Sequence, residues 1–127
     1  MAEISVLVVE DNPINLKLAE VVLSKQGYNV KTASDADEAS EVLKRFHPVV
    51  ILMDLQLPGM DGLELTKILK KDTATKDISI IALTAHAMRG DEERAIEAGC
   101  DGYITKPYDT HTLSALIKEI LEKRSQS

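Results

Sequence analysis

Three short stretches of the chain are apolar at almost every position: residues 4–9 (ISVLVV), 49–53 (VVILM) and 78–83 (ISIIAL). A strand with one face in solvent alternates apolar and polar residues, whereas an unbroken apolar run is typical of a strand buried on both faces. These runs therefore predict the central strands of a parallel sheet. Residues 29–33 (NVKTA) and 102–105 (GYIT) are mixed in character and predict two further strands at the sheet edges.

Apolar residues at helical spacing fill the intervals between these strands. In the first interval they recur along one face of a predicted helix, at Ile14, Leu18, Val21 and Val22. Asn12 is a good N-cap for this helix, and Pro13 takes the first helical position, where a missing N–H costs nothing. Gly27 is the expected end of the helix.

Three later helices show the same spacing, and Asp35 can cap the first of them. Their apolar faces are, in chain order, Ala39, Val42, Leu43 and Phe46; then Leu65, Ile68 and Leu69; then Leu113, Leu116, Ile117, Ile120 and Leu121. The remaining helix, roughly residues 88–98, offers only Met88, Ala95 and Ile96 against the polar run RGDEER, and Gly99 is its expected stop. A helix that buries so little apolar surface is expected to be held loosely.

Strands that alternate with helices five times predict an α/β fold, a doubly wound five-stranded parallel sheet with helices on both faces. No linker, repeat or low-complexity segment interrupts residues 1–127. The tail after the last helix is too short for a second domain. We therefore expect a single domain with no output domain of its own.

The composition and net charge argue against several classes of function and location for this protein. Apolar residues make up 44% and charged residues 28%, as in soluble globular proteins. The net charge of -6 argues against nucleic acid as a main partner, because that affinity depends on Lys and Arg neutralising phosphates. The single cysteine, Cys100, excludes an internal disulfide. With no apolar run long enough for a membrane helix and no signal-peptide pattern, we expect a cytoplasmic protein without membrane contact.

Polar residues with related chemistry follow four of the predicted strands: Glu10, Asp11, Asp54, Thr84 and Lys106. Ligands of open α/β sheets bind at the carboxyl ends of the strands, so we expect these side chains to share one site. Three carboxylates brought together repel each other and need a cation at neutral pH. Oxygen ligands of this kind favour Mg²⁺, which readily shares its coordination sphere with phosphate.

Asp54 could do more than bind a metal, because a carboxylate can attack phosphorus and form an aspartyl phosphate. Lys106 would add a positive charge beside the transferred group, and Thr84 would add a hydroxyl donor. Taken singly, each of these residues is explained as well by a helix cap, a turn or a solvated surface position. Four such coincidences at four strand ends are much harder to explain, so phosphoryl transfer to Asp54 is the favoured interpretation.

Several stretches together resemble the receiver domain of two-component response regulators: LVVEDNPINLKL, LMDLQLPGMDGLEL and ALTAHAMRGDEERAIEAGCDGYITKP. The resemblance extends over essentially the whole chain. It implies the flavodoxin-like strand order 2-1-3-4-5 known from the chemotaxis (CheY-like) member of this family. Within the family the chain looks most like the stand-alone regulators of polar differentiation. Receivers of hybrid histidine kinases are also similar, so an excised receiver is an alternative.

For the metal site, the resemblance implies Asp54 as phospho-acceptor, with Asp11 a direct Mg²⁺ ligand and Glu10 a ligand through water. It also implies that the backbone carbonyl of Gln56 completes the protein ligands. The acidic pair is Glu-Asp rather than the Asp-Asp of many members, which leaves the site plausible.

For the switch, the resemblance implies that Thr84 contacts the phosphoryl group and that the rotamer of Tyr103 follows Thr84. Lys106 matches the lysine of the family pattern, and the Lys106–Pro107 peptide bond is expected to be cis. Gln56 and His86, each two residues after a site residue, are candidates for tuning dephosphorylation.

The implied function is two-component phosphorelay signalling. A histidine kinase or a histidine phosphotransfer protein would donate the phosphoryl group from a phosphohistidine. The fourth helix, fifth strand and fifth helix would then bind an output protein in a phosphorylation-dependent way, with the chain a monomer or weak dimer. The chain would be a switch that assists its own phosphorylation and dephosphorylation, and not an enzyme.

Two other classes of protein fit the sequence less well. A haloacid-dehalogenase-type phosphatase also uses a nucleophilic aspartate on an α/β sheet, but it needs a second aspartate two positions later, where this chain has Gln56. A flavodoxin needs a Ser/Thr/Gly-rich phosphate loop after the first strand, and the EDNP found there would repel phosphate.

Overall fold

The computed structural model describes residues 4–57, 59–84, 91–105 and 110–126. Five parallel strands form one sheet in the order β2-β1-β3-β4-β5. The strands are β1 (Ser5–Val9), β2 (Asn29–Ala33), β3 (Val50–Asp54), β4 (Ser79–Thr84) and β5 (Gly102–Thr105). The order and the parallel pairing confirm the predicted fold, including the edge positions of the two mixed strands.

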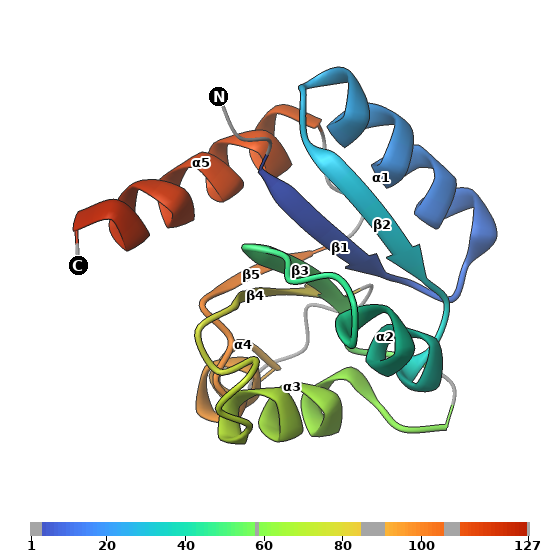
Figure 1. Cartoon of the computed structure of the whole chain (residues 1–127), viewed down its shortest axis with the longest axis vertical. Helices are drawn as coiled ribbons and strands as arrows, with labels where there is room; N and C mark the ends of the chain where they lie inside the picture. Colours follow the sequence, from blue (N-terminus) through green and yellow to red (C-terminus); the bar gives the residue numbers. More distant parts are fainter. Residues whose placement is uncertain (1–3, 58, 85–90, 106–109, 127) are drawn as a thin grey trace.

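Five helices alternate with the strands: α1 (Pro13–Lys25), α2 (Ala36–Leu43), α3 (Gly62–Lys71), α4 (Asp91–Ala98) and α5 (Thr110–Gln126). They form two layers, with α1 and α5 on one face of the sheet and α2, α3 and α4 on the other (Figure 1). Each layer of helices packs against the sheet and forms an apolar core with it. Leu23 and Ile117 belong to the first core, and Leu65 and Ala95 belong to the second.

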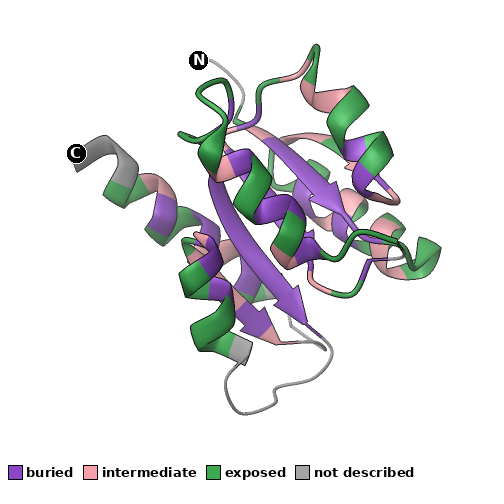
Figure 2. Ribbon diagram, turned by 90° about the horizontal axis from the view of Figure 1, so that it is seen from below, coloured by how far each residue is buried: buried purple, intermediate pink, exposed green. Residues whose placement is uncertain are grey.

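The sheet itself is the most buried part of the molecule. Every residue of β3 and β4 is buried, whereas β2 at the sheet edge is mostly half-buried. Figure 2 shows the buried strands between helices whose outer surfaces are exposed. Unbroken apolar runs thus correspond to strands covered on both faces, as predicted from the sequence.

The ends of the helices follow the predicted signals. The side chain of Asn12 caps α1 by accepting hydrogen bonds from the backbone N–H groups of Ile14 and Asn15, at 2.9 and 3.2 Å. Asp35 caps α2 by accepting from Glu38 N at 2.8 Å. Gly27 follows α1 with a φ of 94°, a left-handed conformation that glycine adopts without steric cost.

The predicted apolar face of α1 is wrong, because it points into solvent. Ile14, Leu18 and Val21 are 77, 55 and 37% exposed, while Ala19 and Leu23 are the buried residues of the helix. These two sets lie about half a turn apart at 3.6 residues per turn, so the helix carries apolar residues on two opposite sides. Helical spacing alone does not say which side faces the sheet.

Three smaller expectations about the helices also need correction. Ile68 and Ile96, predicted on buried faces, are 48 and 59% exposed. Helix α2 ends at Leu43, so Phe46 packs against the core from outside the helix. Met88, predicted in the fourth helix, lies outside the described residues. The small apolar face predicted for α4 is confirmed, because Ala95 and Ala98 are its only buried side chains among Glu92 to Ala98.

Candidate metal centre at the carboxyl edge of the sheet

Three carboxylates meet where strands β1 and β3 end. Glu10 and Asp11 directly follow β1, and Asp54 is the last residue of β3. Each offers a carboxylate oxygen, and these three oxygens all lie within 4.8 Å of one another. The structure therefore brings together all three acidic residues that the sequence analysis assigned to one site. The cause is topological, because parallel neighbouring strands end at the same edge of the sheet.

Backbone hydrogen bonds beyond the strand ends hold these residues in place. Glu10 N donates to Ala33 O at 3.0 Å, and Leu55 N donates to Leu83 O at 2.9 Å. Each bond continues the pairing of the sheet one residue past a strand. Asn12 N then donates to Glu10 Oε2 at 3.4 Å, at the point where the chain turns into α1. The acidic residues thus sit on ordered backbone and not on a long loop.

Burial differs sharply among the three carboxylates. Glu10 is 2% exposed and Asp54 is 3% exposed, whereas Asp11 is exposed. Carboxylates this close repel each other when ionised, and burial of two of them weakens the screening by water. A cation in contact with all three would remove this repulsion. The exposed side of Asp11 leaves access for the ion and for water.

The donor set fits Mg²⁺. All three side chains offer oxygen atoms, which are the ligands that this hard cation prefers, and the ion completes its coordination with water or phosphate oxygens. Gln56, whose carbonyl was predicted as a further ligand, is exposed and lies two residues beyond Asp54. Its N–H donates to Asp54 Oδ1 at 2.9 Å, which orients the Asp54 carboxylate.

The start of α3 packs directly against the backbone of Asp54. A Cβ placed on Gly62 would lie 2.3 Å from Asp54 O and 2.8 Å from Leu55 Cα, so only glycine allows this approach. Gly59 has a φ of 76°, a conformation that suits a turn, whereas Gly62 is required for close packing and not for turn geometry.

Thr84 is the last residue of β4 and is 2% exposed. In the paired strands Asp54 faces Leu83, so Thr84 is one residue further toward the carboxyl edge. Tyr103 faces Ala82 in the next strand and packs, half-buried, against the core that includes α4. The predicted coupling between the hydroxyl of Thr84 and the rotamer of Tyr103 stays a prediction.

A small cavity of about 200 Å³ lies beside Thr84. Its lining comes from the β3–α3 connection, β4 and α4: Leu55, Gln56, Asp61, Leu63, Thr84 and Arg94. The sequence analysis did not assign Arg94 to the site. The only available signal was a lone cation in the acidic segment DEERAIEA. The cavity therefore links the residue after Asp54, the predicted switch hydroxyl and a charged residue of α4.

Three residues of the predicted site lie outside the described residues: Lys106, Pro107 and His86. The role of Lys106 and the cis Lys106–Pro107 bond therefore stay predictions.

Among the helices of the described residues, none is both long enough and apolar enough to cross a membrane.

Comparison with known proteins agrees with this geometry. Residues 6–118 match the family model of the response regulator receiver domain. The chain is 44% identical over 117 residues to the polar-differentiation response regulator DivK of Brucella ovis, covering 92% of this chain and 95% of that protein.

Two solved structures show the same fold. A CheY-like response regulator receiver domain protein from Methanospirillum hungatei superposes with a TM-score of 0.91 at 28% identity, covering 98% of both chains. The receiver domain of a sensor histidine kinase from Pseudomonas aeruginosa superposes with a TM-score of 0.84 at 35% identity, covering 93% of this chain and 97% of that one. The chain therefore belongs to the response regulator receiver domain family of two-component signalling.

Proposed function

We propose that Asp54 accepts a phosphoryl group with Mg²⁺ held by Glu10, Asp11, Asp54 and the carbonyl of Gln56. The observation that carries this proposal is the cluster of three carboxylate oxygens within 4.8 Å of one another, two of them on buried side chains. The Pseudomonas aeruginosa receiver has a magnesium ion coordinated in its active-site cleft. At 35% identity, that structure supports the same ion here.

In the proposed reaction, a carboxylate oxygen of Asp54 attacks the phosphorus of a phosphohistidine on a partner protein. A P–O bond forms as the P–N bond breaks. The electron pair of the broken bond stays on the histidine nitrogen, which takes up a proton. When bound, Mg²⁺ supplies charge neutralisation for the transferring group. The hydrogen bond from Gln56 N to Asp54 Oδ1, at 2.9 Å, holds the attacking carboxylate in a defined orientation.

Family membership implies a histidine kinase or phosphotransfer protein as a partner. The exposed apolar face of α1 supports a docking site for that phosphoryl donor. Ile14, Leu18 and Val21 form this face, and Ile14 is only three residues past Asp11 in the sequence. Exposed apolar residues grouped on one helix face are typical of protein contacts. A donor seated there would bring its phosphohistidine close to Asp54.

The signal would leave through α4, β5 and α5. Phosphorylation adds roughly two negative charges and three acceptor oxygens at Asp54. Thr84 and Arg94 line one cavity, so a change at Thr84 can reach α4 directly. Ile96 on α4 is 59% exposed and offers an apolar contact for an output protein. We propose that output binding depends on phosphorylation, and that the chain is a monomer or weak dimer.

The chain would act as a switch and not as an enzyme with turnover, because Asp54 itself carries the product. Similarity to DivK supports a stand-alone regulator, and similarity to a receiver of a sensor histidine kinase supports an excised receiver as the alternative. The position two residues after Asp54 is Gln56, which lacks the acid that an aspartate-nucleophile phosphatase needs. The buried thiol of Cys100 suits the cytoplasm, where thiols stay reduced.

The direct test uses acetyl phosphate and Mg²⁺, followed by intact-protein mass spectrometry. The wild-type chain should gain the mass of one phosphoryl group, and removal of Mg²⁺ with a chelator should abolish the gain. Asp54→Asn should not be labelled. Asp37→Asn, at an exposed position on α2, is the matched control and should be labelled like the wild type. Full labelling of Asp54→Asn would refute the assignment.

A further inference from the structure

Strand β2 is an edge of the sheet, because β1 is its only neighbour among the described strands (Figure 1). Asn29 and Ala33 turn their backbone polar groups toward β1; Asn29 N, for example, donates to Ile4 O at 2.8 Å. These orientations alternate along a strand, so the N–H and C=O groups of Val30 and Thr32 point away from β1. The sheet can therefore be extended by one more strand at this edge.

A cavity of about 310 Å³ lies between β2 and the end of α2, and is called the β2 cavity below. Its lining consists of Lys31, Val42, Arg45 and Phe46. Val42 and Phe46 are half-buried and pack against the core, so they supply the apolar part of the lining. The volume is at the small end of the roughly 300–1,000 Å³ typical of pockets for whole ligands. One large side chain of a partner suits this size better than a free cofactor.

Lys31 and Arg45 add two positive charges to the β2 cavity, although the chain as a whole carries a net charge of -6. Both side chains are exposed, and neither forms a hydrogen bond or ion pair within the residues that the structure describes. Two acidic residues of α2 already have other partners. Glu38 accepts from a serine hydroxyl at 3.2 Å, and Glu41 pairs with Lys44 at 3.0 Å. The two cations are therefore available to a negatively charged partner.

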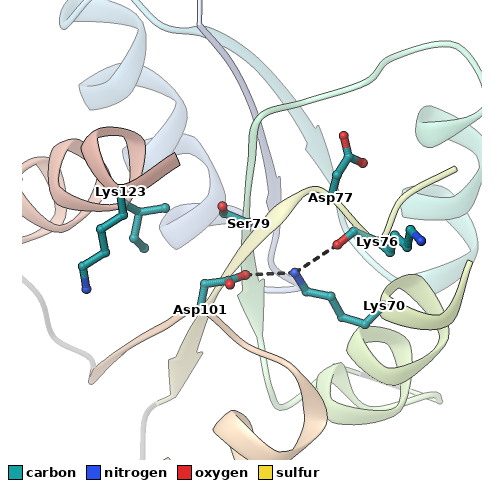
Figure 3. Close-up of a pocket in the computed structure, with 7 residues that line it drawn as sticks. Lys70, Lys76, Asp77, Ser79, Asp101 and Lys123 are labelled. Atoms are coloured by element: carbon teal, nitrogen blue, oxygen red, sulfur yellow. Dashed lines mark hydrogen bonds and ion pairs between the residues drawn. The ribbon is translucent and has the colours of Figure 1, made fainter. Parts of the chain in front are cut away.

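The cavity at the amino end of β4 is different, although it also contains lysines. It has a volume of about 290 Å³, and its lining includes three lysines and two aspartates. The ammonium group of Lys70 donates to Ile78 O at 2.7 Å and pairs with Asp101 at 2.9 Å (Figure 3). Its positive charge is thus neutralised within the protein. Among the described residues, the lining of the β2 cavity includes no carboxylate.

We propose that the edge of β2 binds an extended acidic segment of a partner protein, which adds a strand beside β2 and inserts one apolar side chain into the β2 cavity. Hydrogen bonds with the outward backbone groups of Val30 and Thr32 supply affinity, and Lys31 and Arg45 select carboxylates. A second copy of this chain does not fit. Two β2 strands paired antiparallel about Lys31 would bring like charges together, which is destabilising.

This docking edge is separate from the face proposed to bind an output protein. Strands β4 and β5 lie at the other side of the sheet, with β1 and β3 between them and β2. The β2 cavity contains no residue of the acidic cluster. A partner at β2 therefore leaves α4, β5 and α5 accessible, so the chain can hold one protein constantly while it signals to another. The inference does not depend on phosphorylation of Asp54.

Peptide selection tests the proposal directly. A phage library of random peptides is selected on the wild-type chain, and the most enriched acidic peptide is synthesised with a fluorescein label. It should combine two or more acidic residues with an aliphatic or aromatic one. Its Kd, measured by fluorescence anisotropy, should change less than twofold with Mg²⁺ and beryllofluoride, a phosphoryl mimic. Enrichment of no acidic peptide would overturn the proposal, and a tenfold change in Kd would overturn the separation from the switch.

Two matched double variants test the cations. Lys31→Glu combined with Arg45→Glu should weaken binding of the peptide by about tenfold or more. Both positions are exposed, so the fold should be kept, which circular dichroism checks. Lys67→Glu combined with Lys71→Glu changes the net charge equally at exposed positions on α3 and should bind like the wild type. Equal binding by the two double variants would overturn the role of Lys31 and Arg45.

Hydrogen exchange of the wild type locates the bound peptide, and it decides even if a double variant does not fold. Strand addition should slow exchange at the N–H groups of Val30 and Thr32 by about tenfold or more. Exchange at Asn29, whose N–H already donates to Ile4 O, should change less. Unchanged exchange at Val30 and Thr32 would overturn strand addition. Displacement of the peptide by single-stranded DNA at equal affinity would show attraction for any polyanion and would overturn the assignment to a peptide.

Discussion

A carboxylate oxygen of Glu10 and one of Asp54 lie within 4.8 Å of each other, although the two residues are only 2 and 3% exposed. Two ionised groups in such surroundings repel each other strongly. An ionised pair at the edge of an otherwise apolar sheet would be costly unless a cation offsets its charge. The proposed metal site accounts for this arrangement, because an ion that binds only the folded protein would stabilise it.

Glu10→Gln should change stability in opposite directions with and without Mg²⁺. Without the ion, relief of repulsion should raise the free energy of unfolding by about 1 kcal/mol. With the ion, loss of one negative charge should weaken Mg²⁺ binding about tenfold or more, equivalent to at least about 1.4 kcal/mol. Thermal unfolding across a Mg²⁺ titration measures both effects. Glu20→Gln on α1 is the control, and an identical Mg²⁺ dependence in both variants would argue against Glu10 as a ligand.

Thr84→Ala should separate phosphorylation from the response to it. The mass gain from acetyl phosphate should remain, because Asp54 and the acidic cluster are unchanged. Hydrogen exchange in residues 92–98 should no longer respond to Mg²⁺ and beryllofluoride, because the variant lacks the hydroxyl that is predicted to contact the phosphoryl group. Thr105→Ala is the control, since Thr105 is the partner of Thr84 on the neighbouring strand. A wild-type response in Thr84→Ala would exclude the switch role.

Leu18→Asp should impair transfer from a protein donor but not from acetyl phosphate. Leu18 is 55% exposed, so a charge there should change the stability of the fold by no more than about 0.5 kcal/mol. If the exposed face of α1 binds the donor, a buried unpaired carboxylate should slow transfer from a phosphorylated histidine protein by about tenfold or more. Ile68→Asp makes a similar change on α3. Equal transfer rates for the two variants would place the donor elsewhere.

The strands and the acidic cluster could be predicted because each depends on local signals and one simple rule of topology. An unbroken apolar run such as 49–53 identifies a strand covered on both faces. Parallel strands end at one edge, so Glu10 and Asp54 had to approach each other despite their separation in sequence. The positions of the carboxylates alone do not specify the chemistry of the site. The motifs that resemble those of receiver domains indicated phosphoryl transfer to Asp54.

Other features depend on packing that periodicity does not encode. Helix α1 has apolar residues on both sides, and only the structure shows that Leu23 faces the sheet and Leu18 the solvent. The contact of Lys70 with Asp101 joins residues 31 positions apart. Arg94 lines the site because α4 contacts α3 and β5. Each of these is a tertiary relationship without a local sequence signature.

Gly62→Ala should destabilise the protein, although glycine-to-alanine changes within helices usually stabilise by about 0.5–1 kcal/mol. The added Cβ would lie 2.3 Å from Asp54 O, and the backbone atoms it meets cannot move aside easily. We expect a loss of about 2–3 kcal/mol in urea unfolding, together with slower phosphorylation of Asp54. Gly27→Ala meets no atom within 4 Å and should cost only about 1–2 kcal/mol for its left-handed backbone. Gly62→Ala as stable as wild type would contradict this packing.

The pH dependence of stability should carry a contribution from Cys100. Burial raises the pKa of its thiol from 9.0 to about 11; the Thr66 hydrogen bond and Lys70 oppose the rise, and Asp101 adds to it. Between these values the unfolded chain releases a proton that the folded chain keeps, so stability falls as pH increases. The stability that the buried, protonated thiol contributes is fully present below about pH 9. It is lost progressively toward pH 11, and the free energy of unfolding falls by up to about 2–3 kcal/mol.

Urea unfolding of the wild type and of Cys100→Ala at pH 8 and 10.5 measures this loss. Both proteins should lose stability from groups they share, including Tyr28, whose pKa burial also raises. The wild type should lose about 2 kcal/mol more than the variant, because only the wild type retains the buried thiol. An equal loss in both proteins would show that the Cys100 thiol ionises as readily in the folded chain as in the unfolded one. The close packing of the α4 end against Thr66 would then be wrong.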